Sequence, residues 1–250
     1  MLVLLPPSET KRPGGLGTFA LERLSFPELD LPRREAIAAL AALSLDPERA
    51  ASVLGLSARQ RDLVAVNAAM PHAPTLPAID RYTGVLFDAL DAHSLDASAR
   101  RWLGGHVAIQ TAPFGLVGAT DRIPDYRLSA GVSLPGIPAQ PRHWGAPTTA
   151  ALVAASRSFV LDLRSEAYAA LGPVPSGVPS TYVRVVADSG DGEVRALNHF
   201  NKRTKGLLVR LLATGRPPVR SLAGLASWLR AHDVRVDTTD AAEWRVHALH

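Results

Sequence analysis

FGLVGATDRIPDYRLSAG, residues 114–131, follows an apolar run at residues 107–109 that predicts a buried strand. The segment brings charged and aromatic side chains close together, at Asp121, Arg122, Asp125, Tyr126 and Arg127. A polar, turn-rich segment leaving a buried strand is a common layout for a site, because the strand fixes the loop. An ordinary charged surface loop has the same composition. If the segment is a site, Tyr126 and Arg127 are its candidate ligands, whereas Asp121 and Pro124 are expected to shape the turn.

The composition is ordinary for a globular protein, and the lack of repeats, low-complexity tracts and a linker favours one domain, residues 1–250, over two smaller ones. Apolar residues make up 47% of the chain and charged residues 20%. No apolar run approaches the roughly 20 residues that a membrane helix needs. The opening MLVLL is too short for a signal-peptide core and lacks a basic leader, so it predicts a first strand. We therefore expect a cytoplasmic protein with no membrane partner; its oligomeric state is not predicted.

Cysteine is absent, which excludes thiolate metal sites, thiol nucleophiles and a disulfide-linked partner. The eight histidines are scattered without metal-ligand spacing, so we expect no bound metal. The chain also lacks the phosphate loop, the dinucleotide fingerprint, the zinc-protease motif and the serine nucleophile elbow. We therefore expect no cofactor.

Lysine is scarce in this basic chain. Of 27 basic residues only three are lysine, at Lys11, Lys202 and Lys205. With arginine used almost everywhere else, the remaining lysines mark positions where a compact ammonium is favoured, unless their placement is chance. The net charge of +4 permits an acidic partner.

Residues 46–70 carry the pattern of a helix-hairpin-helix. Asp46 and Pro47 predict a helix start, and Ser57 with Gln60 forms a capping box for a second helix. In such an element the hairpin amides and the second helix start can face a phosphate. The predicted phosphate-binding residues of this element are Gly55, Ser57, Arg59 and Arg61. An ordinary helical hairpin with solvated arginines is the competing interpretation.

Further elements predict a mixed β-sheet surrounded by helices. An apolar strand at residues 159–163 is followed by Ser165 and Glu166, in the position where parallel strands present ligand-binding residues. We expect a helix from Pro147 to about residue 155. Residues 182–186 and 193–197 are expected to pair as strands around the turn 188–192. The fold class predicted is therefore mixed α/β.

A basic helix is expected after residue 198. Residues 195–232 contain eight basic residues and no acidic residue. On a helix, Arg203, Gly206 and Arg210 share a face, and Lys202 lies beside it. Glycine there would admit a close neighbour, for which a phosphate fits best. A solvated basic face is the alternative.

Several motifs occur in an order that resembles the YaaA family of peroxide-stress proteins. They are Ser8-x-x-Lys11, Tyr82-Thr83-Gly84, Phe114-Gly115 with Asp121, Pro124, Tyr126-Arg127-Leu128 and Gly131, then Trp144-Gly145, Ser165-Glu166 with Tyr168, and residues 202–210. The chain departs from the family in its glycine-rich early loop and in Gln110-Thr111-Ala112-Pro113. The resemblance implies a compact mixed α/β fold with a basic cleft and a helix-hairpin-helix at residues 46–70. It also implies DNA binding and the limiting of oxidative damage and of free iron.

Two functions follow from these patterns. The first is a DNA-binding protein of the peroxide-stress response, with low sequence specificity, that uses phosphate contacts. Its expected ligands are Lys11, Gly55, Ser57, Arg59, Arg61, Tyr126, Arg127, Lys202, Arg203, Lys205 and Arg210. The second is an enzyme acting on a nucleotide, nucleoside or base in the same cleft. There Glu166 would be the general acid or base, supported by Ser8, Lys11 and Lys205, with Tyr126 stacking on the base.

Overall fold

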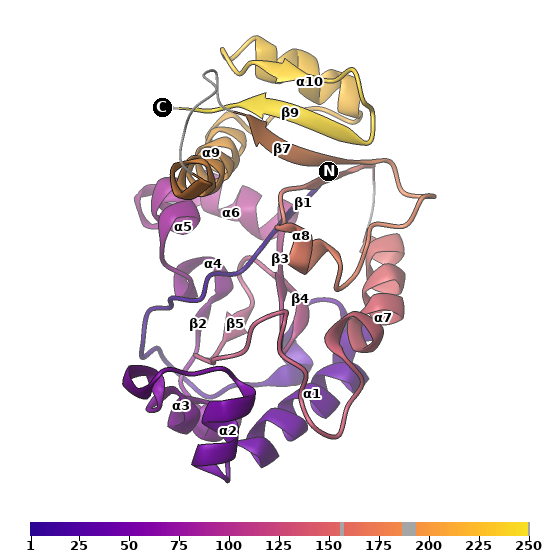
Figure 1. Ribbon diagram of the computed structural model, residues 1–250. Helices are drawn as coiled ribbons and strands as arrows, with labels where there is room; N and C mark the ends of the chain where they lie inside the picture. Colours follow the sequence, from indigo (N-terminus) through magenta and orange to yellow (C-terminus); the bar gives the residue numbers. More distant parts are fainter. Residues whose placement is uncertain (156–157, 187–193, 250) are drawn as a thin grey trace.

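A seven-stranded mixed sheet forms the centre of the computed structural model, which describes residues 1–155, 158–186 and 194–249 (Figure 1). The strand order is β4-β3-β1-β6-β7-β9-β8. The strands are β1 (Leu2–Leu5), β3 (Val107–Thr111), β4 (Gly115–Gly118), β6 (Val160–Asp162), β7 (Ser180–Val186), β8 (Val236–Asp237) and β9 (Glu243–His247). The five inner strands are parallel, and the edge strands β4 and β8 are antiparallel to their neighbours. The predicted mixed α/β class is confirmed.

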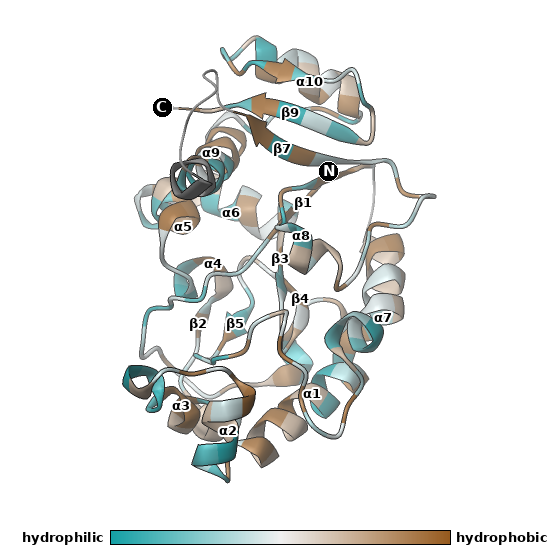
Figure 2. Ribbon diagram, in the orientation of Figure 1, coloured by the Kyte–Doolittle hydropathy of each residue, from teal (hydrophilic) through white to brown (hydrophobic). Residues whose placement is uncertain are grey.

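Both faces of the inner sheet are buried, as parallel sheets require. In β1, Val3 and Leu5 belong to one apolar core and Leu4 to a second, because successive side chains point to opposite faces. The first core includes helices at the left and top of Figure 1, and the second is closed by Trp144 and Leu152 from the helix at the right. In Figure 2 the brown, apolar positions are prominent along β7 and β9.

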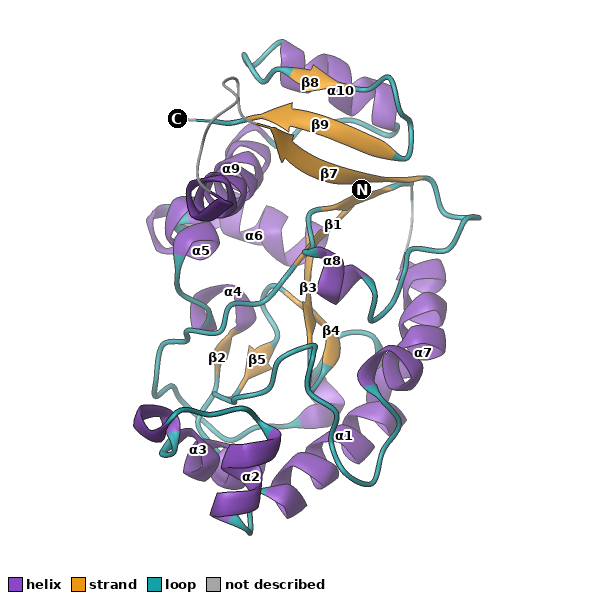
Figure 3. Cartoon of the chain, in the orientation of Figure 1, coloured by secondary structure: helices purple, strands orange, loops and turns teal. Residues whose placement is uncertain are grey.

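Ten helices occur in the described part of the chain (Figure 3). They are α1 (Asp30–Leu43), α2 (Pro47–Val53), α3 (Leu63–Ala69), α4 (Ala78–Arg81), α5 (Val85–Leu90), α6 (Ala97–His106), α7 (Gln140–Ala155), α8 (Glu166–Ala169), α9 (Val194–Gly215) and α10 (Leu222–Arg230). A second small sheet joins β2 (Leu76–Pro77) to β5 (Arg122–Ile123). Among the described helices, none has the length and apolar character needed to cross a membrane.

The predicted hairpin of residues 182–197 is wrong. β7 pairs in parallel with β6 and with β9, and the chain is helical from Val194 onward. The expected turn 188–192 lies outside the described residues. The strand β7 finds its partners in distant segments, and these pairings override the local turn signal at Asp188-Ser189-Gly190.

Helix α7 begins at Gln140, seven residues before the predicted start at Pro147. Side chains in its first turns bind distant backbone: Gln140 Nε2 donates to the carbonyls of Ser129 and Val132, and Trp144 Nε1 donates to that of Ala112. These tertiary contacts hold the helix start in place, so Pro147 lies inside the helix despite its missing N–H.

The predicted basic helix is confirmed as part of α9, but Gly206 packs against protein. A Cβ added at Gly206 would lie 2.1 Å from the carbonyl oxygen of Leu86 on α5. Helix α5 therefore occupies the position beside Gly206 where we expected a phosphate, so that expectation is wrong. Arg210 lies one turn further along α9, and it donates to the carbonyls of Leu90 and Asp91 at the carboxyl end of α5.

Candidate functional site

Two groups of polar residues include side chains that follow the carboxyl ends of β1 and β6: Glu9 and Lys11 follow β1, and Arg164, Glu166 and Tyr168 follow β6. These strands are parallel neighbours, so their carboxyl ends meet at one edge of the sheet. The Lys11 group comprises Glu9, Lys11, Tyr82, Asp125, Tyr126, Arg127 and Tyr168. The Lys205 group comprises Asp162, Arg164, Glu166, Tyr182, Arg184 and Lys205.

Lys11 lies against two buried tyrosine rings. Its Nζ is 4.1 Å from the ring centroid of Tyr126 and 5.7 Å from that of Tyr82. The two phenol oxygens are hydrogen-bonded to each other at 2.7 Å. Burial raises the pKa of both tyrosines well above the ordinary value, so both phenols stay protonated. The Lys11 ammonium therefore faces neutral aromatic surface and gains a cation–π contact.

The amine of Lys11 titrates near neutral pH. Burial lowers its pKa to about 8; the charges of Asp125 and Glu9 raise the pKa, and those of Arg127 and Arg81 lower it. Its Nζ donates one hydrogen bond, to the carbonyl oxygen of Glu9 at 3.3 Å. The residue nevertheless keeps part of its surface in solvent.

Arg127 is held beside Lys11 from two sides. Its guanidinium forms an ion pair with Glu9 at 3.0 Å, and its backbone exchanges two hydrogen bonds with the buried Asn67 amide. Tyr126, the adjacent residue, is 2% exposed. Lys11 covers one face of its ring and Phe114 meets it edge-on, so the ring is not available to stack on a base.

Lys205 is more deeply enclosed than Lys11, with 4% of its surface exposed. Its Nζ donates to the carbonyl oxygen of Arg164 at 3.2 Å and lies 5.3 Å from the ring centroid of Tyr182. Burial lowers the pKa of Lys205 to about 8, and Asp162 opposes this shift. A groove of about 360 Å³ is lined in part by Asp162, Arg164 and Tyr182; Lys205 itself does not line it.

A buried ion pair supports the Lys205 group. Arg164 Nε and Nη2 donate to the two carboxylate oxygens of Asp162 at 2.9 and 2.7 Å. Its Nη1 donates to the carbonyl oxygen of Gly172 at 2.9 Å. Arg164 is fully buried and Asp162 nearly so, so this bidentate pair fixes the segment after β6.

The two groups flank the short helix α8. The charges that act on Lys11 belong to Asp125, Arg127, Glu9 and Arg81, and those that act on Lys205 belong to Asp162, Arg184 and Glu166. Tyr168 on α8 interacts with Glu9 and Arg127 of the first group. The single basic cleft containing Lys11, Arg127, Glu166 and Lys205 therefore remains a prediction.

Glu166 is exposed at the start of α8. Its carboxylate pairs with Arg184 at 3.3 Å and belongs to the Lys205 group. Ser8, the other residue of the enzyme hypothesis, has its hydroxyl 3.2 Å from that of Thr10. Neither side chain has a hydrogen bond to Lys11 in the described structure.

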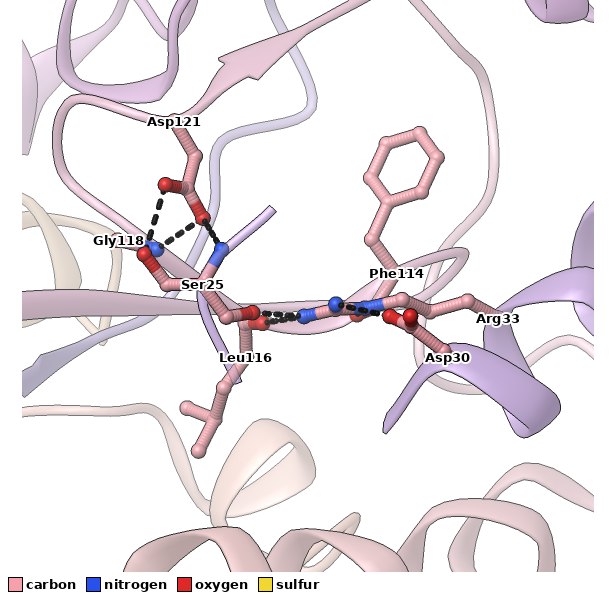
Figure 4. A network of polar contacts seen from close by, with 7 residues as sticks. All are labelled: Ser25, Asp30, Arg33, Phe114, Leu116, Gly118 and Asp121. Atoms are coloured by element: carbon pink, nitrogen blue, oxygen red, sulfur yellow. Dashed lines mark hydrogen bonds and ion pairs between the residues drawn. The ribbon is translucent and has the colours of Figure 1, made fainter. Parts of the chain in front are cut away.

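The turn after β4 is built by Asp121, as expected from the sequence (Figure 4). Its carboxylate accepts the backbone N–H of Gly118 and of Ser25 at 2.8 Å, and the Ser25 hydroxyl at 2.8 Å. Below this turn, Arg33 spans three backbone carbonyls and Asp30. Asp121 therefore has a structural role.

Two short helices flank an exposed turn in residues 46–70. Asp46 caps α2 by accepting the N–H of Arg49, and Gly55 adopts a positive φ of 62°. The second helix differs from the prediction, because Ala58–Gln60 is a 3₁₀ turn and α3 begins only at Leu63. The predicted helix-hairpin-helix is not established by this geometry.

The sequence-predicted ligands of this turn are all exposed: Gly55, Ser57, Arg59 and Arg61. The amides of Gly55 and Leu56 donate to carbonyls of Ser52 and Ala51, so they close the end of α2. Arg61 pairs with Glu48. Lys202 and Arg203 are exposed on α9.

Sequence reasoning missed Arg33, Asp162, Arg164 and Tyr182. A partial signal for the ion pair existed, since Asp162 ends the apolar strand β6 and Arg164 comes two residues later. No sequence pattern indicated the role of Arg33, because most of its hydrogen-bond acceptors are backbone carbonyls.

Unfolding at different pH values tests the two titrating amines. A folded-state pKa of about 8, below the ordinary lysine value near 10.4, means that the unfolded chain binds more protons above pH 8. Stability should therefore rise with pH, by about 1 kcal/mol per lysine between pH 7 and 9. Above pH 10 it should fall, because burial raises the pKa of Tyr82, Tyr126 and Tyr168.

Urea unfolding at pH 7, 8 and 9 measures this rise. The double variant Lys11→Met/Lys205→Met removes both amines, so its profile over the same range should be flatter than that of the wild type. Equal slopes for the two proteins would refute the assignment.

The structure is a mixed α/β domain in which amines and guanidinium groups gather near the carboxyl ends of the parallel strands β1 and β6. The sequence matches the family described as "Peroxide stress protein YaaA" over residues 1–231, so the chain belongs to this family.

Curated relatives match two thirds or more of the chain. The UPF0246 protein CE1889 of Corynebacterium efficiens is 43% identical over 245 residues, which is 96% of each chain. The UPF0246 protein SCO2297 of Streptomyces coelicolor is 45% identical over 222 residues, covering 87% of this chain and 85% of the relative. A UPF0246 protein of Neisseria gonorrhoeae is 25% identical over 180 residues, covering 68% of this chain and 70% of the relative.

Proposed function

We propose that this peroxide-stress protein binds DNA, largely through backbone phosphates and with low sequence specificity, and thereby limits oxidative damage. The observation that carries the proposal is the charge of α9 and the segment after it. Residues 195–232 hold eight basic residues and no acidic one, and Lys202 and Arg203 are exposed on adjacent positions of α9. In the described residues no carboxylate pairs with either. Unmatched cations on a surface favour a polyanion.

The exposed turn at residues 54–61 supplies a second contact in this proposal. Gly55 and Leu56 use their amides within α2, so the available donors are the amides of Ala58 and Arg59 at the start of the 3₁₀ turn. The Arg59 side chain adds an exposed cation beside them. Arg210 takes a supporting position, since it fixes α9 against α5.

A salt series on a DNA duplex tests the proposal. Removing one phosphate-binding cation should lower the slope of log affinity against log salt by about 0.9, so the double variant Lys202→Gln/Arg203→Gln should reduce the slope by about 2. Its affinity at about 0.1 M salt should fall at least tenfold. Fluorescence anisotropy with duplexes of two unrelated sequences measures both quantities.

The matched control is Arg101→Gln/Arg142→Gln, which removes two exposed cations from α6 and α7. It should keep a slope close to that of the wild type. An affinity that does not respond to salt, or an equal reduction in the control, would refute phosphate binding by α9.

A further inference from the structure

The Lys11 group contains an amine with the properties of a nucleophile. At pH 7.5 an amine whose pKa is about 8 is neutral in roughly a quarter of the molecules, against about 0.1% for an ordinary lysine. Only the neutral form can attack a carbonyl carbon, and lowering the pKa by burial is a known way to activate lysine. In the described structure Lys11 forms no ion pair, and its single hydrogen bond, to Glu9, is long at 3.3 Å.

The backbone holds this amine in a fixed position. Lys11 forms a β-bridge with Tyr82, and the flanking residues are bonded to the same strand-like segment, with Arg12 N donating to Arg81 O at 2.8 Å and Thr83 N to Thr10 O at 3.1 Å. The Tyr126 ring supports the Nζ from below. Such preorganisation favours one reactive geometry.

Lys11 and Lys205 differ in solvent exposure. Lys11 is partly exposed, and the neighbouring residues Glu9, Thr10 and Arg12 are exposed. Lys205 is 4% exposed and has Arg164 and Tyr182 against its amine. The segment that carries Lys11 therefore reaches the surface, where a large molecule can contact it, whereas Lys205 is buried.

The charges around Lys11 suit an aldehyde that is carried by a phosphate-linked chain. Arg127 lies near the amine but is ion-paired with Glu9, whereas the exposed Arg12 follows Lys11 in the chain and forms no ion pair in the described structure. Guanidinium groups bind phosphate oxygens in pairs of hydrogen bonds. DNA that has lost a base presents this combination, because its deoxyribose opens to an aldehyde between two phosphates.

We propose that Lys11 is the nucleophile of an aldehyde-capturing site, where its Nζ forms an imine with the open-chain deoxyribose of DNA that has lost a base. This inference rests on the proposed DNA binding. The Nζ lone pair forms a bond to C1′, and the carbonyl oxygen takes a proton to give a carbinolamine. The nitrogen gives up its two protons, one when the carbinolamine forms and one when the carbinolamine hydroxyl is protonated and leaves as water, so the balance is amine plus aldehyde to imine plus water. Glu9 and Asp125, whose charges act on Lys11, carry the protons.

Reductive trapping tests the inference on the full chain. A duplex with one natural abasic site is mixed with the protein and sodium cyanoborohydride, which reduces an imine to a stable amine. We expect a covalent protein–DNA band on a denaturing gel, and peptide mapping by mass spectrometry should place the adduct on Lys11. Lys11→Arg should lower the yield at least tenfold.

Two controls separate Lys11 from lysines in general. The variant Lys11→Arg/Arg142→Lys restores the number of lysines at an exposed position of α7, and it should trap no more than Lys11→Arg does. Mapping of the wild-type adduct does not depend on the folding of any variant. An adduct on Lys202, Lys205 or the amino terminus in place of Lys11 would overturn the inference.

Two further substrates show whether a negative trapping result contradicts the inference alone or the proposed DNA binding as well. A duplex with a tetrahydrofuran site, which has no aldehyde, measures binding alone. Binding to this duplex without trapping of the abasic duplex overturns the inference and leaves the proposed function intact, whereas loss of both overturns both. Free 2-deoxyribose 5-phosphate should trap at least tenfold less than abasic DNA at equal concentration; equal trapping would overturn DNA as the source of the aldehyde.

Discussion

Arg33→Met is expected to lower the free energy of unfolding by about 3 kcal/mol or more. Arg33 is fully buried, and its guanidinium donates to the carbonyls of Phe114 (2.8 Å), Leu116 (2.6 Å) and Ser25 (2.7 Å). Each buried carbonyl left without a donor costs about 1–3 kcal/mol. Methionine fills much of the volume but donates nothing, so the destabilisation reports the hydrogen bonds.

The control for this prediction is the neighbouring residue. Arg34 is exposed on the same helix, and Arg34→Met should change stability by no more than about 0.5 kcal/mol. Urea unfolding followed by circular dichroism measures both variants. Equal destabilisation at the two positions would show that Arg33 does not stabilise the edge strand through these bonds.

Arg164→Met should cost about 3–5 kcal/mol, because it leaves the carboxylate of Asp162 buried without its partner. The same substitution also removes the donor to the Gly172 carbonyl. Breaking this pair should loosen the segment after β6, which carries the residues beside Lys205.

A double-mutant cycle isolates the pair. Asp162→Asn/Arg164→Met removes both charges, so it should be more stable than the sum of the two single substitutions predicts, by about 1 kcal/mol or more. Additive effects would show that the ion pair contributes nothing beyond its separate residues.

Local sequence patterns correctly predicted those elements that are stabilised by contacts between near neighbours in the chain. The first strand, the cap at Asp46 and the helix after Ser221 all follow from residues that contact near neighbours. The hairpin around residues 188–192 was wrong because the partners of β7 are β6 and β9, which the turn signal cannot encode. The start of α7 was misplaced for a similar reason, since Gln140 and Trp144 bind carbonyls of other segments.

The candidate site was predicted in part. The scarcity of lysine indicated Lys11 and Lys205, and the structure gives both amines tyrosine neighbours. It could not indicate which residues surround each amine, because Tyr126 beside Lys11 and Tyr182 beside Lys205 come from distant segments of the chain. Arg33 was missed because it contacts carbonyls more than 80 residues away in the chain.

The position of β1 between β3 and β6 limits when this strand can join the sheet during synthesis. β1 is made before both of its sheet neighbours, since it pairs with β3 at residues 107–109 and with β6 at residues 160–162. Neither neighbour exists until more than 100 residues have been made, and every sheet contact of β1 closes a long loop. Such non-local pairing slows folding and leaves an apolar strand exposed in the meantime. The apolar strand Leu2–Leu5 therefore has no sheet partner until at least residue 107 has been made.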